Sequence, residues 1–223
     1  MVTNNLKFGL LFLVAILCCN CSNSRIVKPL AKGENQLSAH FGGPIIIQGT
    51  LPIPLPLTTV SYARGITESF TAFGGIGLTA AAFKDLHLDF GCTKGWLQPK
   101  GWQPGLSTSA DLHFIADKSN FLFLPMLDAN AYWNVGKNNS TAYVGFNNNF
   151  DLSATRSAGE KQTTHWLPSF VAGYTFRNSG SWNYTLEVRD IAPFTDNVKL
   201  VPSYSSLGTT GALGFYFAVN KTF

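Results

Sequence analysis

Two short runs of carboxylate and imidazole residues are the part of this sequence best suited to chemistry. Asp85, His87 and Asp89 occupy alternate positions, and Asp111 and His113 repeat the pattern further along the chain. Side chains alternate across a β-strand, so residues two apart point to the same face. A carboxylate beside a histidine orients the ring for work as a general base. The same groups are also ligands for a divalent cation.

A narrow barrel lumen gives these side chains a plainer explanation. Such a lumen is filled by polar side chains that bond to one another, because buried polar groups require partners. Further polar residues fall on the same expected inward face. These are Asp128, Asn130, Asn147, Asn149, Glu187 and Arg189. No Gly-x-Ser-x-Gly, His-Glu-x-x-His or phosphate-loop motif is present. We favour polar packing over catalysis, keep catalysis open, and assign no cofactor and no metal.

Ten segments predict the strands that would position these residues. Each is near the roughly 9–11 residues that a tilted strand needs to cross a bilayer. In one of them Leu112 and Phe114 alternate with Asp111 and His113. The segments are 34–43, 57–65, 69–80, 83–95, 102–114, 122–135, 141–151, 164–177, 181–191 and 211–223.

The lengths of the connections between these segments alternate. Every second connection is short, whereas three of the others are long, at residues 44–56, 152–163 and 192–210. Outer-membrane barrels have short periplasmic turns and longer external loops. The pattern therefore predicts an all-β fold over residues 34–223: an antiparallel up-and-down transmembrane β-barrel of about ten strands.

The last segment has one apolar face and ends on an aromatic residue. Phe215, Phe217, Val219 and Phe223 share that face, and Lys221 interrupts the row. This stretch resembles the C-terminal recognition strand of bacterial outer-membrane β-barrels, in which the final residue is usually Phe. The resemblance implies residence in the bacterial outer membrane, contact with its lipid, and recognition by the barrel-insertion machinery through this strand. Outer-membrane barrel proteases and lipid A deacylases use Asp and His residues, which keeps the hydrolase alternative open.

The N-terminus predicts export. Lys7 precedes an apolar run over residues 8–17, which is too short to span a bilayer and is followed by small polar residues. One positive charge followed by about ten apolar residues is typical of a signal peptide. We assign residues 1–18 to it.

Three cysteines lie within four residues at the end of that run. This resembles a bacterial lipoprotein signal, in which a cysteine after the apolar run is acylated and begins the mature chain. Cys19 is the first candidate and Cys21 the alternative, and residues 19–33 would form a tether. Ordinary cleavage after Ser22 or Ser24, with no lipid, is the other interpretation.

The first long connection, residues 44–56, is almost wholly apolar and carries several prolines. Proline fixes the backbone and blocks strand pairing. We consider a partner-docking or membrane-interface segment, an inward-folded plug, and an extension of the two flanking strands, and keep all three.

The low content of charged residues narrows the range of possible functions. Charged residues make up only 13% of the chain, and the net charge of +4 is not clustered, which argues against binding of nucleic acid. Three functions remain, in order of preference. The first is a non-enzymatic structural or accessory component of the bacterial envelope, with envelope proteins as partners. The second is a narrow pore for small solutes, and the third is a barrel-embedded hydrolase acting on lipid A or envelope proteins.

Overall fold

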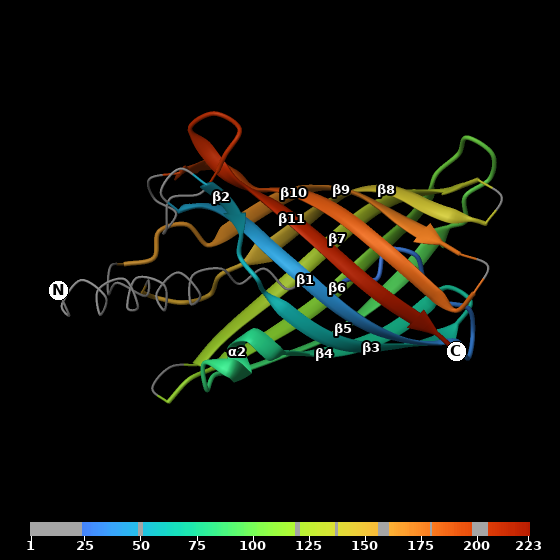
Figure 1. Ribbon diagram of the computed structural model, residues 1–223, viewed down its shortest axis with the longest axis horizontal. Helices are drawn as coiled ribbons and strands as arrows, with labels where there is room; N and C mark the ends of the chain where they lie inside the picture. The colour runs from blue at the N-terminus through green and yellow to red at the C-terminus, as the bar shows by residue number, and fades with distance from the viewer. Residues whose placement is uncertain are drawn as a thin grey trace.

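The computed structural model describes residues 24–48, 51–118, 121–136, 138–155, 161–178, 180–197 and 205–223. Within them ten tilted strands form one antiparallel barrel (Figure 1). The barrel strands are β1 (Asn35–Gln48), β3 (Thr58–Thr67), β4 (Phe70–Gly77), β5 (Leu86–Leu97), β6 (Gly105–Ala116), β7 (Phe121–Val135), β8 (Ser140–Phe150), β9 (Trp166–Arg177), β10 (Trp182–Asp196) and β11 (Thr210–Thr222).

Each strand pairs with its neighbours along the chain, and β1 pairs with β11 to close the barrel. The closing register runs from Gln36 opposite Thr222 to Pro44 opposite Gly214. The predicted fold class, an antiparallel β-barrel of about ten strands, is confirmed.

The two faces of the barrel wall are reversed relative to a water-soluble protein. Large apolar side chains point outwards, with Phe90 55% exposed, Leu127 50% and Val188 46%. Charged side chains point inwards, with Asp89 fully buried and Arg189 only 4% exposed. An apolar exterior around a polar interior is the pattern of a barrel that faces lipid.

The strands are long enough to cross a membrane. β5, β6 and β9 have 12 residues each. At a rise of about 3.3 Å per residue and a tilt near 40°, such a strand covers about 30 Å, the thickness of the hydrocarbon core. Trp96, Trp166 and Trp182 lie at strand ends and are about half exposed or more, as in an interfacial aromatic girdle.

Short and long connections between strands lie at opposite ends of the barrel, as expected. The end that carries Phe223 has short turns such as residues 68–69 and 178–181, whereas the opposite end carries the longer connections (Figure 1). Short turns are periplasmic in outer-membrane barrels, so the Phe223 end has the form of a periplasmic end.

One connection contains a helix that the sequence analysis had assigned to a strand. The prediction that a strand runs to residue 80 is wrong, because α2 (Leu78–Ala82) begins directly after β4. Its three alanines favour a helix. The Thr79 hydroxyl donates to the Pro56 carbonyl at 3.0 Å and accepts from the Thr58 N–H at 2.8 Å, which ties this helix to the neighbouring connection. No helix among the described residues is long and apolar enough to cross a bilayer.

The apolar connection between β1 and β3 extends the barrel wall. β1 runs on to Gln48, and β2 (Leu51–Pro54) pairs with it, from Ile45 opposite Pro54 to Gln48 opposite Leu51. Of the three interpretations offered for residues 44–56, the structure shows the extension of flanking strands. The prolines are tolerated because β2 is an edge strand, whose second side needs no ladder hydrogen bonds.

The closing register can be tested with a disulfide. Ser38 and Asn220 are direct partners across the seam and both point into the lumen, so Ser38→Cys with Asn220→Cys should cross-link. Direct cross-strand partners are about 4.5–5.5 Å apart at Cα, within the range that a disulfide spans. The measurement is the gel mobility of the boiled, refolded chain with and without reductant, in a background where the four native cysteines are serine.

A matched control moves one residue along β1. Leu37 is partnered with Lys221 and points outwards, so Leu37→Cys with Asn220→Cys should stay open. Equal cross-linking of both pairs, or none in the first, would contradict this register.

Candidate functional site

The lumen contains part of the chain itself. Residues 24–32, the lumen segment, lead into β1 from inside the barrel, and their backbone is bound by hydroxyl groups of the wall. Thr93 Oγ1 donates to the Ile26 carbonyl at 2.8 Å, and Ser107 Oγ donates to the Val27 carbonyl at 2.6 Å. The Leu30 N–H donates to Thr71 Oγ1 at 2.8 Å. Backbone groups that lack a strand partner are thereby satisfied, as burial requires.

Apolar side chains of the lumen segment form the small hydrophobic clusters of this interior. Ile26 and Leu30 pack with Ala63 and Phe73. A second cluster consists of Val27, Tyr132, Tyr143 and Val171. Contacts on two sides position the segment against opposite parts of the wall.

Gly65 of β3 is the point of closest approach. The Gly33 N–H donates to the Gly65 carbonyl at 2.8 Å, and the Gly65 N–H donates to the Glu34 carbonyl at 2.9 Å. A Cβ at Gly65 would overlap the Ala31 carbonyl. Glycine is therefore required where the chain passes β3 before it enters β1.

Arg25 places a positive charge at the centre of the lumen. Its Nε lies 3.3 Å from Asp128 Oδ2, and its Nη1 lies 3.4 Å from Glu187 Oε2. Its Nη2 also donates to Asn130 Oδ1. The side chains of Arg25, Asp128 and Glu187 are each less than 10% exposed, so these ion pairs are shielded from solvent.

Glu187 joins a second cation to this network. Arg189 Nε donates to Glu187 Oε1 at 2.5 Å, and the Tyr143 hydroxyl donates to Glu187 Oε2 at 2.7 Å. The Arg189 guanidinium also lies over the Tyr216 ring, 4.1 Å from its centroid. Two guanidiniums thus face two carboxylates, and the buried charges of this network balance.

The predicted lumen residues and the predicted tether meet in this network. The structure places Asp128, Asn130, Glu187 and Arg189 inward from β7 and β10. Asn147 donates to Asp128 Oδ1, and Asn149 lies further along β8, partly buried. Sequence reasoning missed Arg25, which it left in the tether. The available signal was that the tether carries three cations, Arg25, Lys28 and Lys32, and no carboxylate.

The remaining residues singled out from the sequence lie outside this network or outside the described residues. Phe215, Phe217 and Val219 are on the outer face of β11, and Phe217 stacks with Phe41 and Tyr184. Phe223 is exposed at the end of the chain. Cys19 and Cys21, like the signal-peptide residues 1–18, lie outside the described residues.

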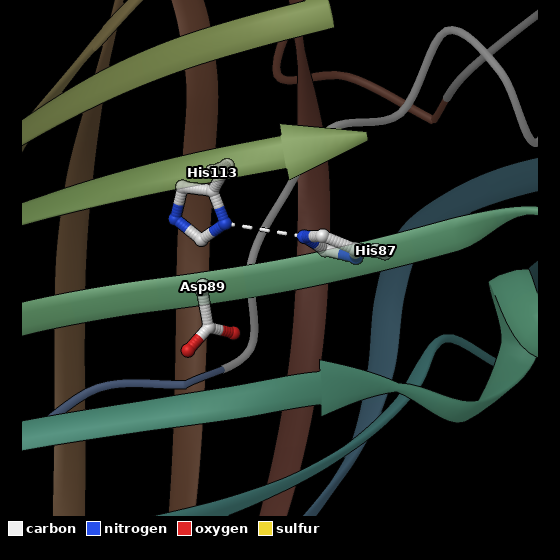
Figure 2. A group of neighbouring side chains, drawn as sticks. All are labelled: His87, Asp89 and His113. Carbon is white, nitrogen blue, oxygen red and sulfur yellow. Dashed lines mark hydrogen bonds between the residues drawn. The ribbon is translucent and has the colours of Figure 1, made fainter. Parts of the chain in front are cut away.

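A second cluster joins the two predicted Asp-His runs. His87 Nε2 lies 3.1 Å from His113 Nδ1, and His113 Nε2 lies 3.0 Å from Asp111 Oδ2. Figure 2 shows the two rings on neighbouring strands, with Asp89 beside them on the strand of His87. Ser24 Oγ of the lumen segment donates to Asp89 Oδ2 at 2.9 Å.

Asp85 does not belong to this cluster. It lies in the connection after α2, before β5 begins at Leu86, and it is partly exposed. The expected strand face of alternating acidic and imidazole residues therefore starts at His87, because residues 83–85, the first of the predicted strand, form the turn between α2 and β5.

The geometry of this second cluster decides what it can do. Asp111, His113 and His87 lie in a row, and such a row can orient an imidazole ring or hold a proton. Among the described residues, neither ring hydrogen-bonds to a serine, threonine or cysteine side chain, so the nucleophile and base pair of covalent catalysis is not formed there. Side-chain donor atoms of His87, Asp89 and His113 do lie within 4.8 Å of one another, as metal ligands would.

A cavity of about 520 Å³ lies beside the lumen segment. Among its lining residues are Arg25, His40, Tyr143, Glu187, Arg189 and Asn220. It is therefore polar on the side of β10 and β11 and bordered by the lumen segment on the other.

Comparison with known proteins finds fold likeness only. No family model matches the chain, and no curated protein matches it. Three solved structures are similar. The translocator domain of the autotransporter NalP from Neisseria meningitidis has 10% identity and a TM-score of 0.47, covering 99% of this chain and 96% of that chain. OmpT, an outer membrane protein of Vibrio cholerae, has 8% identity and a TM-score of 0.37, covering 94% and 73%. The outer membrane protein OprG from Pseudomonas aeruginosa has 10% identity and a TM-score of 0.30, covering 89% and 99%.

Likenesses at these TM-scores carry no argument about function, and the location of the chain rests on its own structure. A closed barrel leaves no unpaired strand edge in lipid, and its apolar outer wall matches a bilayer. The protein is therefore a β-barrel built to cross a membrane.

The buried charge network predicts a large effect of Glu187→Ala. Removing this carboxylate breaks its ion pair with Arg189 and one of the two ion pairs of Arg25, and breaking buried pairs costs about 3–5 kcal/mol of unfolding free energy. The measurement is guanidinium unfolding of the refolded barrel in detergent, followed by tryptophan fluorescence.

Glu68→Ala removes an exposed carboxylate from a turn and is the control, with an expected change within about 0.5 kcal/mol. A loss below about 1 kcal/mol for Glu187→Ala would show that the network does not hold the lumen together.

Proposed function

We propose that this chain is a non-enzymatic structural or accessory barrel of the bacterial outer membrane, whose lumen is closed by its own residues 24–32. The observation that carries the proposal is the binding of the lumen segment by the charge network. Arg25 reaches Asp128 on β7 and Glu187 on β10 with one guanidinium. A segment bound in this way acts as an internal strut between strands that are far apart in the barrel.

The distribution of contacts supports a strut rather than a passing chain. Hydroxyls on β4, β5 and β6 bind the backbone of the lumen segment, while charged groups on β7 and β10 bind its arginine. Because the contacts are both backbone and side-chain, and because they come from several strands, displacement of the segment would leave many buried polar groups unpaired.

Export and insertion are part of the same proposal. Residues 1–18 act as the signal peptide, Cys19 or Cys21 is the acylation site, and β11 is the strand recognised by the barrel-insertion machinery. Phe215 and Phe217 on the outer face of β11 support the last of these roles, since that face is apolar. Envelope proteins are the expected partners.

A narrow pore is the second candidate. The cavity of about 520 Å³ beside the lumen segment is the observation that favours it, because its walls carry polar and charged side chains suited to small solutes. The two candidates differ in one respect: a strut closes the lumen, whereas a pore leaves a continuous path.

Planar-bilayer recordings separate them. The refolded full chain should give no single-channel steps, whereas a refolded barrel beginning at Gly33 should give them, because its lumen has lost the segment. Arg25→Ala should give intermittent openings, since it removes both ion pairs while keeping the backbone contacts.

Lys32→Ala is the control, because it removes an exposed cation from the same segment and should stay silent. Steady conductance of the full chain would support the pore instead. Silence of the barrel that begins at Gly33 would show that something other than residues 24–32 closes the lumen.

A further inference from the structure

We infer that His87, Asp89 and His113 form a binding site for a divalent transition-metal ion of the Zn²⁺ class, inside the barrel wall. The inference goes beyond the proposed function and is independent of it, because it rests on the spacing of three side chains on β5 and β6 (Figure 2).

The two rings already have the spacing of ligands on one ion. His87 Nε2 and His113 Nδ1 are 3.1 Å apart. Two nitrogens bound to Zn²⁺ at about 2.0–2.1 Å in a tetrahedron are about 3.3 Å apart. In the metal-free state a proton between the rings bridges them, and its release on binding would direct both lone pairs at the ion.

Asp111 lies beside the second ring nitrogen of His113. Its Oδ2 is 3.0 Å from His113 Nε2, an ion-pair distance that is not aligned as a hydrogen bond in this structure. The negative charge of Asp111 favours a ring proton on Nε2, which would leave Nδ1 as a lone pair facing His87. A carboxylate on the second nitrogen of a ligand histidine is the usual arrangement around zinc, where it orients the ring and makes it a stronger ligand. Asp111 is thus a positioning residue.

Asp89 supplies the third ligand. It is fully buried; its Oδ2 accepts from Ser24, and its Oδ1 accepts no hydrogen bond among the described residues. The donor atoms of the three residues lie within 4.8 Å, so a carboxylate oxygen would move by at most about 1.5 Å to reach the roughly 3.3 Å spacing of ligands on one ion.

The electrostatics of this cluster also call for a cation. Among the described residues, neither Asp89 nor Asp111 forms an ion pair with a lysine or arginine, although both are buried. Buried carboxylates are normally paired or coordinated to a metal. The Arg25 network shows that this lumen supplies guanidinium groups elsewhere, so the absence of one here is specific to the cluster.

The ligand set selects the kind of metal. Two imidazole nitrogens and one carboxylate suit Zn²⁺ and its neighbours in the transition series, whereas Mg²⁺ and Ca²⁺ prefer oxygen alone. His87 is less buried than the other two ligands, which leaves an approach from the end of the barrel that carries α2. A fourth position would be open to water.

The test uses the full chain, refolded in detergent without a histidine tag and stripped of metal. Titration with Co²⁺ should give the visible absorption of one tetrahedral ion per chain, and Zn²⁺ should displace it. His87→Ala and His113→Ala should each weaken binding at least about 100-fold, and Asp111→Asn about 10- to 100-fold.

His165→Ala and His40→Ala are the matched controls. Both histidines lie outside the cluster, with His165 on the Asp151 carbonyl and His40 on Ser61, and both variants should bind as the unaltered chain does. Heat-modifiable gel mobility verifies that every variant is folded.

X-ray absorption of the unaltered chain with Zn²⁺ keeps the inference testable if a histidine variant fails to fold. Two imidazole ligands in the zinc shell are expected. A shell of oxygen atoms only, no stoichiometric binding, or equal affinity in the folded histidine variants would overturn the inference.

Discussion

Hydrogen-bonded closure between β1 and β11 is the constraint from which the rest of this structure follows. Lipid offers no partner to a backbone N–H or carbonyl, so a sheet can cross a bilayer only when its two edges meet. Closure turns one face of every strand towards lipid and the other towards a confined lumen. Phe90 and Val188 therefore point outwards, while Asp89 and Arg189 are buried. A lumen of this kind must in turn satisfy every polar group that it encloses.

The lumen segment supplies the second cation of the buried charge network. β7 and β10 contribute Asp128 and Glu187 to the network but only Arg189 as a cation, so the wall alone would hold two carboxylates against one guanidinium. Arg25 restores the balance. Buried ion pairs add little stability over apolar packing, yet breaking one leaves an isolated buried charge. The network therefore specifies where residues 24–32 must lie more than it strengthens the barrel.

Sequence predicted the wall of the barrel better than its contents. Alternation in segments such as 102–114, and the sorting of connection lengths by end, indicated ten strands and their inward faces, because both patterns follow from local geometry. The helix α2 was missed, since five residues are too few to show a helical periodicity. Arg25 was missed because its partners on β7 and β10 are more than one hundred residues away, and no local pattern records such contacts.

The candidate site shows the same division. The alternation of His87 with Asp89, and of Asp111 with His113, placed these groups on inward faces, but the 3.1 Å contact between the rings depends on the register of β5 against β6. That register also separates two kinds of buried carboxylate. Those of β7 and β10 are compensated by arginines of the chain, whereas Asp89 and Asp111 form no ion pair with an arginine or lysine among the described residues. Because Ser24 of the lumen segment binds the same Asp89 carboxylate that a metal would share, the inferred ion and the segment that closes the lumen would meet at one side chain.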